Sequence, residues 1–202
     1  MPHRIRGKHT SLEQLMNNAR DETTEALAII DFEHHELHSG DHFNVQYSVA
    51  DLGAATTPDD MMTLTFKTPN TTKWLHMIVA AVSSSGARFR FIEGGTGGGA
   101  SPTGTITAYN SDRNNKPAST ILNLSSVAGS VSYDATLVTG GTSLVDVFIG
   151  ADGLGVSFTG GTARGEQEWI LKANTQYQLS IFEADNVPGT LQMSWYEHTN
   201  VT

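Results

Sequence analysis

Apolar and polar residues alternate in several short stretches of this chain. The period of two is clearest at residues 43–49, 62–66 and 88–91. Strict alternation places every second side chain on the same side of an extended backbone, which is typical of a β-strand with one buried face. In the last stretch, Arg88 and Arg90 are predicted to lie on the outer face.

A longer and nearly unbroken apolar run, residues 74–82, predicts a strand that is buried on both faces. Shorter runs rich in β-branched and aromatic residues predict further strands at residues 27–32, 105–109, 121–124, 131–137, 145–149, 156–158, 168–172, 176–183 and 190–197. Loops are predicted between them, as in the glycine-rich residues 93–104. We therefore expect an all-β protein, an antiparallel jelly-roll-like sandwich with an N-terminal arm and one short helix.

The helix is predicted at residues 11–20. Its first turn contains a capping box, S-x-x-Q. Its apolar positions follow the helical spacing i, i+3, i+4 and i+7, and they are Leu12, Leu15, Met16 and Ala19. A helix of this length needs a surface to lie on, either its own body or a partner. We expect residues 1–26 to form a basic arm with this helix, and residues 27–202 to form the jelly-roll-like body.

The charge of the chain is divided unevenly. The net charge is −9, but residues 1–20 carry four bases and one acid, Glu13. The remaining residues carry eight bases and twenty acids. An acidic body argues against nucleic acid as a partner, because nucleic-acid binding needs clustered bases. A basic arm on an acidic body indicates that the arm meets a separate acidic surface. The simpler alternative is a mobile terminus without a partner.

Several classes of protein are disfavoured by what the sequence lacks. The 202 residues include no cysteine, which excludes disulfides and thiolate sites and fits assembly in the cytoplasm. No apolar run reaches the length of about 18 residues that a membrane helix needs, and the basic N-terminus is not followed by the apolar region of a secretory signal. We therefore expect neither a membrane partner nor secretion.

Residues 30–43 contain the densest cluster of potential metal-binding or catalytic side chains, with four of the eight histidines and four acids. In an extended chain His34, Glu36 and His38 share one face, and such groups are ligands of Zn²⁺ and Fe²⁺. Their order, H-x-E-x-H, reverses the order found in cupins, where H-x-H precedes the glutamate. The zincin pattern H-E-x-x-H is missed by one residue and would need a helix.

A metal site of this kind would also need a ligand from a second strand. His76 and His198 are the candidates, but neither lies in a supporting motif. We therefore predict no metal and no cofactor, and interpret the segment as a polar strand end at a subunit or domain contact. The predicted contact residues are His34, His35, Glu36, His38, His42 and Arg113. Part of this histidine set is expected to titrate near neutrality, so that low pH loosens the assembly.

Other catalytic patterns are weak. There is no G-x-S-x-G motif, and the glycines at 97–99 are not followed by the Lys-Ser/Thr of a phosphate-binding loop. Acid pairs such as Asp59 and Asp60 are common on acidic surfaces. The tryptophans Trp74, Trp169 and Trp195 lie in apolar strand patterns, which favours a place in the core over sugar stacking. No catalytic residue is predicted.

Three segments together resemble the small β-proteins that accompany the major capsid protein of tailed bacteriophages. They are residues 30–43 (IDFEHHELHSGDHF), residues 104–114 (GTITAYNSDRN), and the C-terminal pair 168–177 (EWILKANTQY) and 194–198 (SWYEH). The family usually has a stretch like N-R-N-R in the second segment. This chain departs from it at Ser111 and Asp112, which weakens a role for that turn as a basic anchor.

The resemblance implies a capsid decoration, or cement, protein rather than an enzyme. Such a protein is made in the host cytoplasm and sits on the outer surface of the phage head, where it bridges major capsid protein subunits. A symmetric homo-oligomer is expected, with a trimer favoured over a dimer. The expected capsid-binding residues are Arg4, Arg6, Lys8, Leu12, Leu15, Met16 and Arg20. Two alternatives stay open, a carbohydrate- or host-receptor-binding virion protein and a cupin-like metal-dependent enzyme.

Overall fold

The computed structural model describes residues 37, 39–50, 62–84, 86–96, 102–114, 117–149, 156–159, 168–182 and 188–199. All of them belong to one compact unit, Glu36–Thr202. Strands dominate this unit, and the predicted all-β class is confirmed. The basic arm, the short helix, the strand at residues 27–32 and the boundary between residues 26 and 27 all lie outside the described residues.

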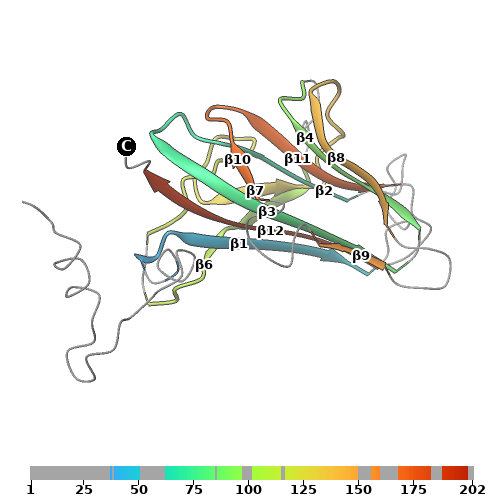
Figure 1. The fold of residues 1–202 in the computed structure, drawn as a ribbon, viewed down its shortest axis with the longest axis horizontal. Coiled ribbons are helices and arrows are strands. Elements are labelled where there is room, and N and C mark those ends of the chain that lie inside the picture. The colour runs from blue at the N-terminus through green and yellow to red at the C-terminus, as the bar shows by residue number, and fades with distance from the viewer. Residues whose placement is uncertain are drawn as a thin grey trace, which may run out of the picture. The chain divides into compact units, whose positions relative to one another are not determined.

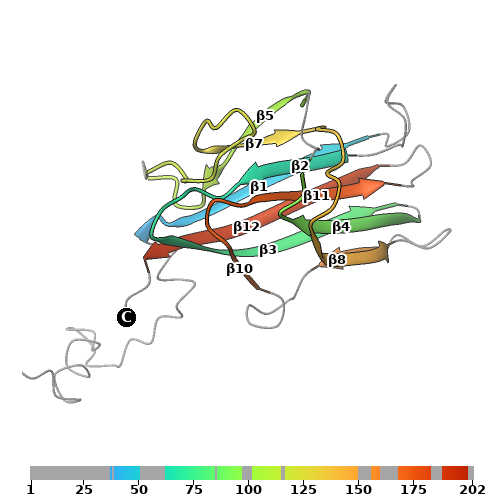
Figure 2. The same cartoon turned by 90° about the horizontal axis from the view of Figure 1, so that it is seen from above.

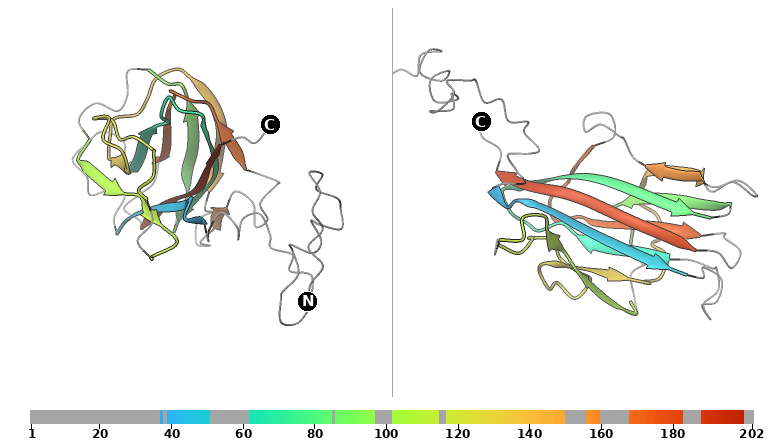
Figure 3. Two further views of the ribbon diagram at one scale, coloured as in Figure 1. Left: turned by 90° about the vertical axis from the view of Figure 1, so that its left-hand side faces the viewer. Right: turned by 90° about the horizontal axis from the view of Figure 1, so that it is seen from below.

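Twelve strands of the described unit form two antiparallel sheets that face each other (Figure 1, and end-on in Figure 3, left). Sheet 1 has the order β10-β3-β12-β1-β6, and β9 also pairs with β3. Its strands are β1 (His42–Val49), β3 (Lys73–Ser83), β6 (Tyr109–Asn110), β9 (Val156–Thr159), β10 (Trp169–Leu171) and β12 (Gly189–Thr199).

Sheet 2 has the order β5-β7-β2-β11-β4-β8, and Figure 2 looks onto it with sheet 1 behind. Its strands are β2 (Met62–Lys67), β4 (Ala87–Glu93), β5 (Gly104–Thr107), β7 (Ser130–Tyr133), β8 (Thr142–Ile149) and β11 (Gln176–Phe182). The strand pairs of both sheets are antiparallel, as the period-two patterns predicted.

The predicted jelly roll is confirmed by the order of the strands. β9 and β10 pair with successive parts of the same edge of β3, at Ala80–Ser83 and Leu75–Met77, and so act as one interrupted strand. With β5, β6 and β7 set aside as an insertion, eight strands remain. In chain order, sheet 1 then reads 1-8-3-6 and sheet 2 reads 2-7-4-5. This is the arrangement of two Greek keys that defines a jelly roll.

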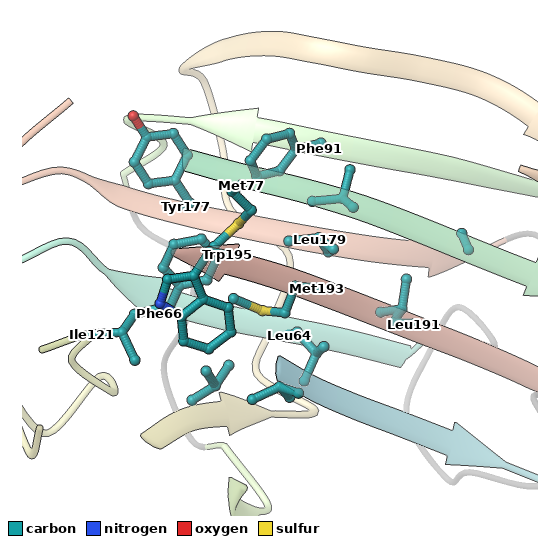
Figure 4. Packing of buried hydrophobic residues seen from close by; sticks show 14 of the residues in the cluster. Leu64, Phe66, Met77, Phe91, Ile121, Tyr177, Leu179, Leu191, Met193 and Trp195 are labelled. Carbon is teal, nitrogen blue, oxygen red and sulfur yellow. The ribbon is translucent and has the colours of Figure 1, made fainter. Parts of the chain in front are cut away.

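The core lies between the sheets and is built from the inward residues of both. Figure 4 shows Trp195 and Met193 of β12 facing Phe66 of β2 and Tyr177 of β11 across this space. All four side chains are fully buried. Burying each such side chain stabilises the folded state by about 1.5–3 kcal/mol before the loss of conformational entropy is counted. The alternation of apolar and polar residues along β1, β2, β11 and β12 therefore determines which face of each strand turns inward.

Two strand predictions are wrong. Residues 74–82 are not buried on both faces, because Leu75 and Met77 are buried while Trp74 and Val82 are exposed. Residues 121–124 are not a strand, and only Leu122 forms isolated bridges. Ile121 is nevertheless buried, so the apolar pattern identified a core contact but not a β-ladder.

The outer face of sheet 2 is covered in its centre by the chain between β7 and β8. Thr63 Oγ1 donates to the carbonyl of Ala135 at 2.9 Å. Gln178 Nε2 donates to the carbonyl of Thr136 at 3.0 Å, and its Oε1 accepts from the amide of Val138 at 2.9 Å. Both faces of β2 and β11 are therefore buried, and sheet 2 offers little of its centre to a partner.

Candidate binding face on sheet 1

The outer side of sheet 1 presents the outward residues of four strands, and we call it the binding face. Figure 3 (right) looks onto this side, where β1, β12 and β3 run next to one another. The register places one residue of each strand in a row, in the order Ile170, His76, Tyr196 and His42. The alternation that buries one side of these strands thus aligns one aliphatic, one phenolic and two imidazole side chains in a row on the other side.

Apolar side chains are exposed along the β3 flank of the binding face. Ile170 is 57% exposed, Val82 44% and Trp74 41%. Ile78 lies between the latter two on the same side of β3 and is half-buried. Burial of these side chains by a partner would be favourable in proportion to the apolar area removed from water. The strip runs along a sheet, so it forms a broad surface rather than a cleft.

His76 is the centre of a polar cluster within this face. Its Nδ1 lies 2.8 Å from Oε1 of Glu168 and 3.0 Å from the hydroxyl of Tyr196. Its Nε2 lies 2.9 Å from Nε2 of His198. The rings of His76 and Tyr196 stack with centroids 4.6 Å apart, and the ring of Trp74 is tilted against His198 at 6.3 Å. Three strand ends therefore hold these groups in fixed positions.

His42 is bound within the body, although it belongs to the same row. Its Nδ1 lies 2.6 Å from the hydroxyl of Ser111 and its Nε2 lies 3.0 Å from the hydroxyl of Ser194. Asn44 also donates to Ser111 at 3.2 Å. These bonds connect β1 to β12 and to the turn after β6. The ring is buried, so its expected role at a contact stays a prediction.

The turn after β6 contains Arg113, which with His42 is one of the two predicted contact residues that the structure describes. The amides of Asp112 and Asn114 donate to the side chains of Asn110 and Asp112, each at 2.9 Å, as expected for a polar turn of the Asx type. The exposed guanidinium of Arg113 lies over the ring of Tyr109 at 5.5 Å. Arg113 and Tyr109 thus present a charged and aromatic surface at the β6 end of sheet 1.

The other predicted site residues lie outside the described residues. For the shell contact these are His34, His35, Glu36 and His38, and for capsid binding they are Arg4, Arg6, Lys8, Leu12, Leu15, Met16 and Arg20. Their roles stay predictions. The sequence also named His76 and His198 separately, and the structure brings the two together with Glu168 and Tyr196. Pairing of β3 with β12 creates this cluster, and no local spacing could have revealed it.

Two further polar contacts link segments of the body that are far apart in the sequence. Glu197 accepts hydrogen bonds from Ser119 and Thr120 and so anchors the loop after β6. Tyr47 donates to Asp134 at 2.5 Å. Burial raises the pKa of both groups, and the hydrogen bond raises the pKa of Tyr47 further while opposing the rise for Asp134. Both groups therefore stay uncharged more readily than usual.

A shallow depression of ≈ 600 Å³ lies at the opposite end of sheet 1. It is lined by the end of β1, the end of β3 and the start of β12, and its lining includes Ser48, Val49, Val82, Pro188 and Thr190. Hydroxyl and apolar groups line it, and none of the lining residues has a titratable side chain.

In the described part of the chain, no group of three or more His, Cys, Asp or Glu side chains is arranged to hold a metal ion. Nor does this part contain a helix long and apolar enough to span a membrane. Comparison of the chain with protein-family models, curated proteins and solved structures found no match. The fold and the binding face are therefore the basis for assigning a function.

Proposed function

We propose that this chain is a non-enzymatic structural protein that decorates a tailed-phage head and stabilises it by bridging major capsid protein subunits. The observation that carries this proposal is the contrast between the sheets. The centre of sheet 2 is closed by the chain's own residues 135–138, whereas sheet 1 exposes Trp74, Val82 and Ile170 on a continuous strand surface.

A broad surface of this kind suits a macromolecular partner. Protein interfaces are centred on aromatic and aliphatic side chains, with polar groups around them. On the binding face, Trp74 and Ile170 flank His76 and Tyr196, whose Nδ1 and hydroxyl already hydrogen-bond to neighbours. A partner can therefore cover this region without leaving those polar groups unpaired.

The sequence supplies the second part of the proposal. A basic arm in front of an acidic body can order itself on an acidic surface of the shell, with opposite charge offsetting the entropy of ordering. The contact residues expected in the arm would then act together with the binding face. Many copies on one lattice add avidity, so each contact can be weak. Self-association as a trimer or dimer belongs to the same proposal.

The experiment compares two substitutions at equally exposed apolar residues. Ile170 and Val127 are each 57% exposed, but only Ile170 lies on the binding face. Purified wild-type protein, Ile170→Asp and Val127→Asp are titrated onto phage heads that lack the protein, and bound copies are counted. We expect Ile170→Asp to weaken binding at least tenfold and Val127→Asp to bind as wild type does. Equal binding by all three would contradict the use of this face.

A second candidate function is recognition of a host carbohydrate by the virion. The exposed ring of Trp74, near the start of β3, and the exposed ring of Tyr109 favour it, because sugars stack on exposed aromatic faces. A glycan array separates the two functions. Selective glycan binding that is lost in Trp74→Ala would favour the carbohydrate reading, and an array without signal would favour the capsid contact.

A further inference from the structure

The two imidazole rings at the corner of the binding face point the same nitrogen at each other. Nε2 of His76 and Nε2 of His198 are 2.9 Å apart. The ring centroids are 4.7 Å apart and the ring planes are inclined by 42°. The rings thus converge through Nε2, and their other nitrogens point away from the contact toward different neighbours.

The neighbours at Nδ1 determine where the ring protons lie. Nδ1 of His76 faces Oε1 of Glu168 at 2.8 Å and the hydroxyl of Tyr196 at 3.0 Å. The carboxylate oxygen only accepts, and the hydroxyl can accept as well as donate. Nδ1 of His198 lies 3.3 Å from the carbonyl oxygen of Thr199, which also only accepts. Each ring therefore has an acceptor in place for an Nδ1–H. When both rings are neutral and donate in this way, both Nε2 atoms carry lone pairs.

Two facing lone pairs repel each other unless a positive centre lies between them. A proton shared by the two Nε2 atoms is one such centre, and a metal ion is another. For metal–nitrogen bonds of about 2.0–2.1 Å, two neighbouring ligands at a right angle lie about 2.9 Å apart. The observed separation equals this value, which matches the square-planar or octahedral positions that Cu²⁺ and Ni²⁺ prefer.

The surroundings of the pair also fit a metal site. A histidine that binds a metal usually donates its other N–H to a carboxylate, which fixes the tautomer and makes the ring a better ligand. Glu168 stands in this position toward His76, and both side chains are largely buried. The ligands project from β3 and β12, two strands that pair along eleven residues, so little ordering is needed on binding.

We propose that His76 and His198 form a two-histidine site for a divalent late-transition-metal ion, with water in the remaining coordination positions. Glu168 acts as a positioning residue through His76. Binding requires both rings to be neutral, and His198 reaches the required tautomer by donating Nδ1–H to Thr199. This site does not depend on the proposed capsid role, and among the ions of this class Cu²⁺ is expected to bind most tightly.

The test must separate this pair from the other histidines. The full-length chain is prepared with His3, His9, His34, His35 and His38 replaced by glutamine, which leaves His42, His76 and His198. Cu²⁺ is titrated into this variant and followed by calorimetry and electron paramagnetic resonance. We expect one ion per chain, with hyperfine coupling to two imidazole nitrogens. Affinity should fall as the pH is lowered, because protons compete with the metal for the ring nitrogens.

Further substitutions in that background identify the ligands. His198→Gln should lower Cu²⁺ affinity at least tenfold and leave coupling to one nitrogen. Glu168→Gln should lower affinity about tenfold or more while keeping two coupled nitrogens. Circular dichroism confirms that each variant keeps its fold. The proposal is overturned if His198→Gln binds Cu²⁺ as tightly as the background variant, or if only the unmodified chain binds it, since the ion would then belong to the N-terminal histidines.

Discussion

The indole Nε1 of Trp195 donates a 3.1 Å hydrogen bond to Oε1 of Glu197, two residues further along β12. Both side chains point into the body and both are buried. The same carboxylate accepts from the hydroxyl of Ser119 at 2.5 Å and from the amide and hydroxyl of Thr120. One buried acid therefore links the central strand of sheet 1 to the loop that carries Ile121 into the core.

Replacing Glu197 with glutamine tests this link. The amide nitrogen of Gln takes the place of one carboxylate oxygen and faces a donor instead of accepting from it. We expect Glu197→Gln to lower the free energy of unfolding by about 1–3 kcal/mol. Chemical denaturation measures the change. Gln192→Ala, at an exposed position of the same strand, serves as the control and should change stability by about 0.5 kcal/mol or less.

Asp134 and Glu93 are expected to respond to pH in opposite directions. Burial raises the pKa of Asp134 above its ordinary value, and the hydrogen bond from Tyr47 only partly opposes this. A carboxyl group with a raised pKa in the folded state contributes stability below its unfolded pKa and loses it as the pH rises. Asp134→Asn should therefore gain stability relative to wild type as the pH rises from 3 to 7. Asn also tolerates the left-handed backbone at this position (φ 49°). An unchanged difference across this range would contradict the prediction.

The contribution of Glu93 to stability is expected to change with pH in the opposite direction. Burial would raise its pKa, but hydrogen bonds from Lys172 and Tyr177 outweigh burial and lower it. The stability that this group contributes is present above the unfolded pKa and is lost as the pH falls through the folded pKa. Glu93→Gln should therefore be less stable than wild type at pH 7, by about 1 kcal/mol because Lys172 is largely solvated. The gap should shrink as the pH is lowered from 7 toward 3, and denaturation curves recorded across this range provide the measurement.

Two adjacent glycines before β8 form a matched pair. Gly140 and Gly141 both have positive φ, 68° and 81°. A Cβ at Gly140 would meet nothing within 4 Å, whereas one at Gly141 would lie 2.6 Å from the carbonyl oxygen of Glu93 and 2.7 Å from the amide of Gly95. We expect Gly140→Ala to cost about 1–2 kcal/mol from backbone strain alone. Gly141→Ala should cost more, because backbone atoms must also move. Equal thermal stability of the two variants would argue against this close approach.

The strands could be predicted from sequence where one face is buried and the other is not. Phe43, Val45 and the residues that follow them alternate because β1 has an open outer side, and the pattern identified that strand. Burial on both faces was wrongly predicted for residues 74–82, because the sequence alone does not distinguish exposed apolar residues such as Trp74 and Val82 from buried ones. Their exposure depends on what covers the sheet, which the local pattern does not encode.

The candidate site could be predicted less well, because it is created by pairing between distant strands. His76 and His198 are separated by 122 positions, and their approach follows from the β3–β12 register, which places His76 opposite Tyr196. Glu168 joins them only because the interrupted edge strand returns to β3 at β10. The sequence named both histidines as candidate ligands, but it contained no information about register. The jelly-roll order of the strands was inferred from strand number and chain length, and the structure confirms it.

The most direct test of the proposed role is a cryo-EM map of the tailed-phage head that this protein is proposed to decorate. We expect jelly-roll density on the outer surface at repeated symmetry positions, with β3 and β10 of sheet 1 against the shell and Ile170 at the contact. Heads that contain no copy of the chain, or copies that touch the shell only through sheet 2, would contradict it.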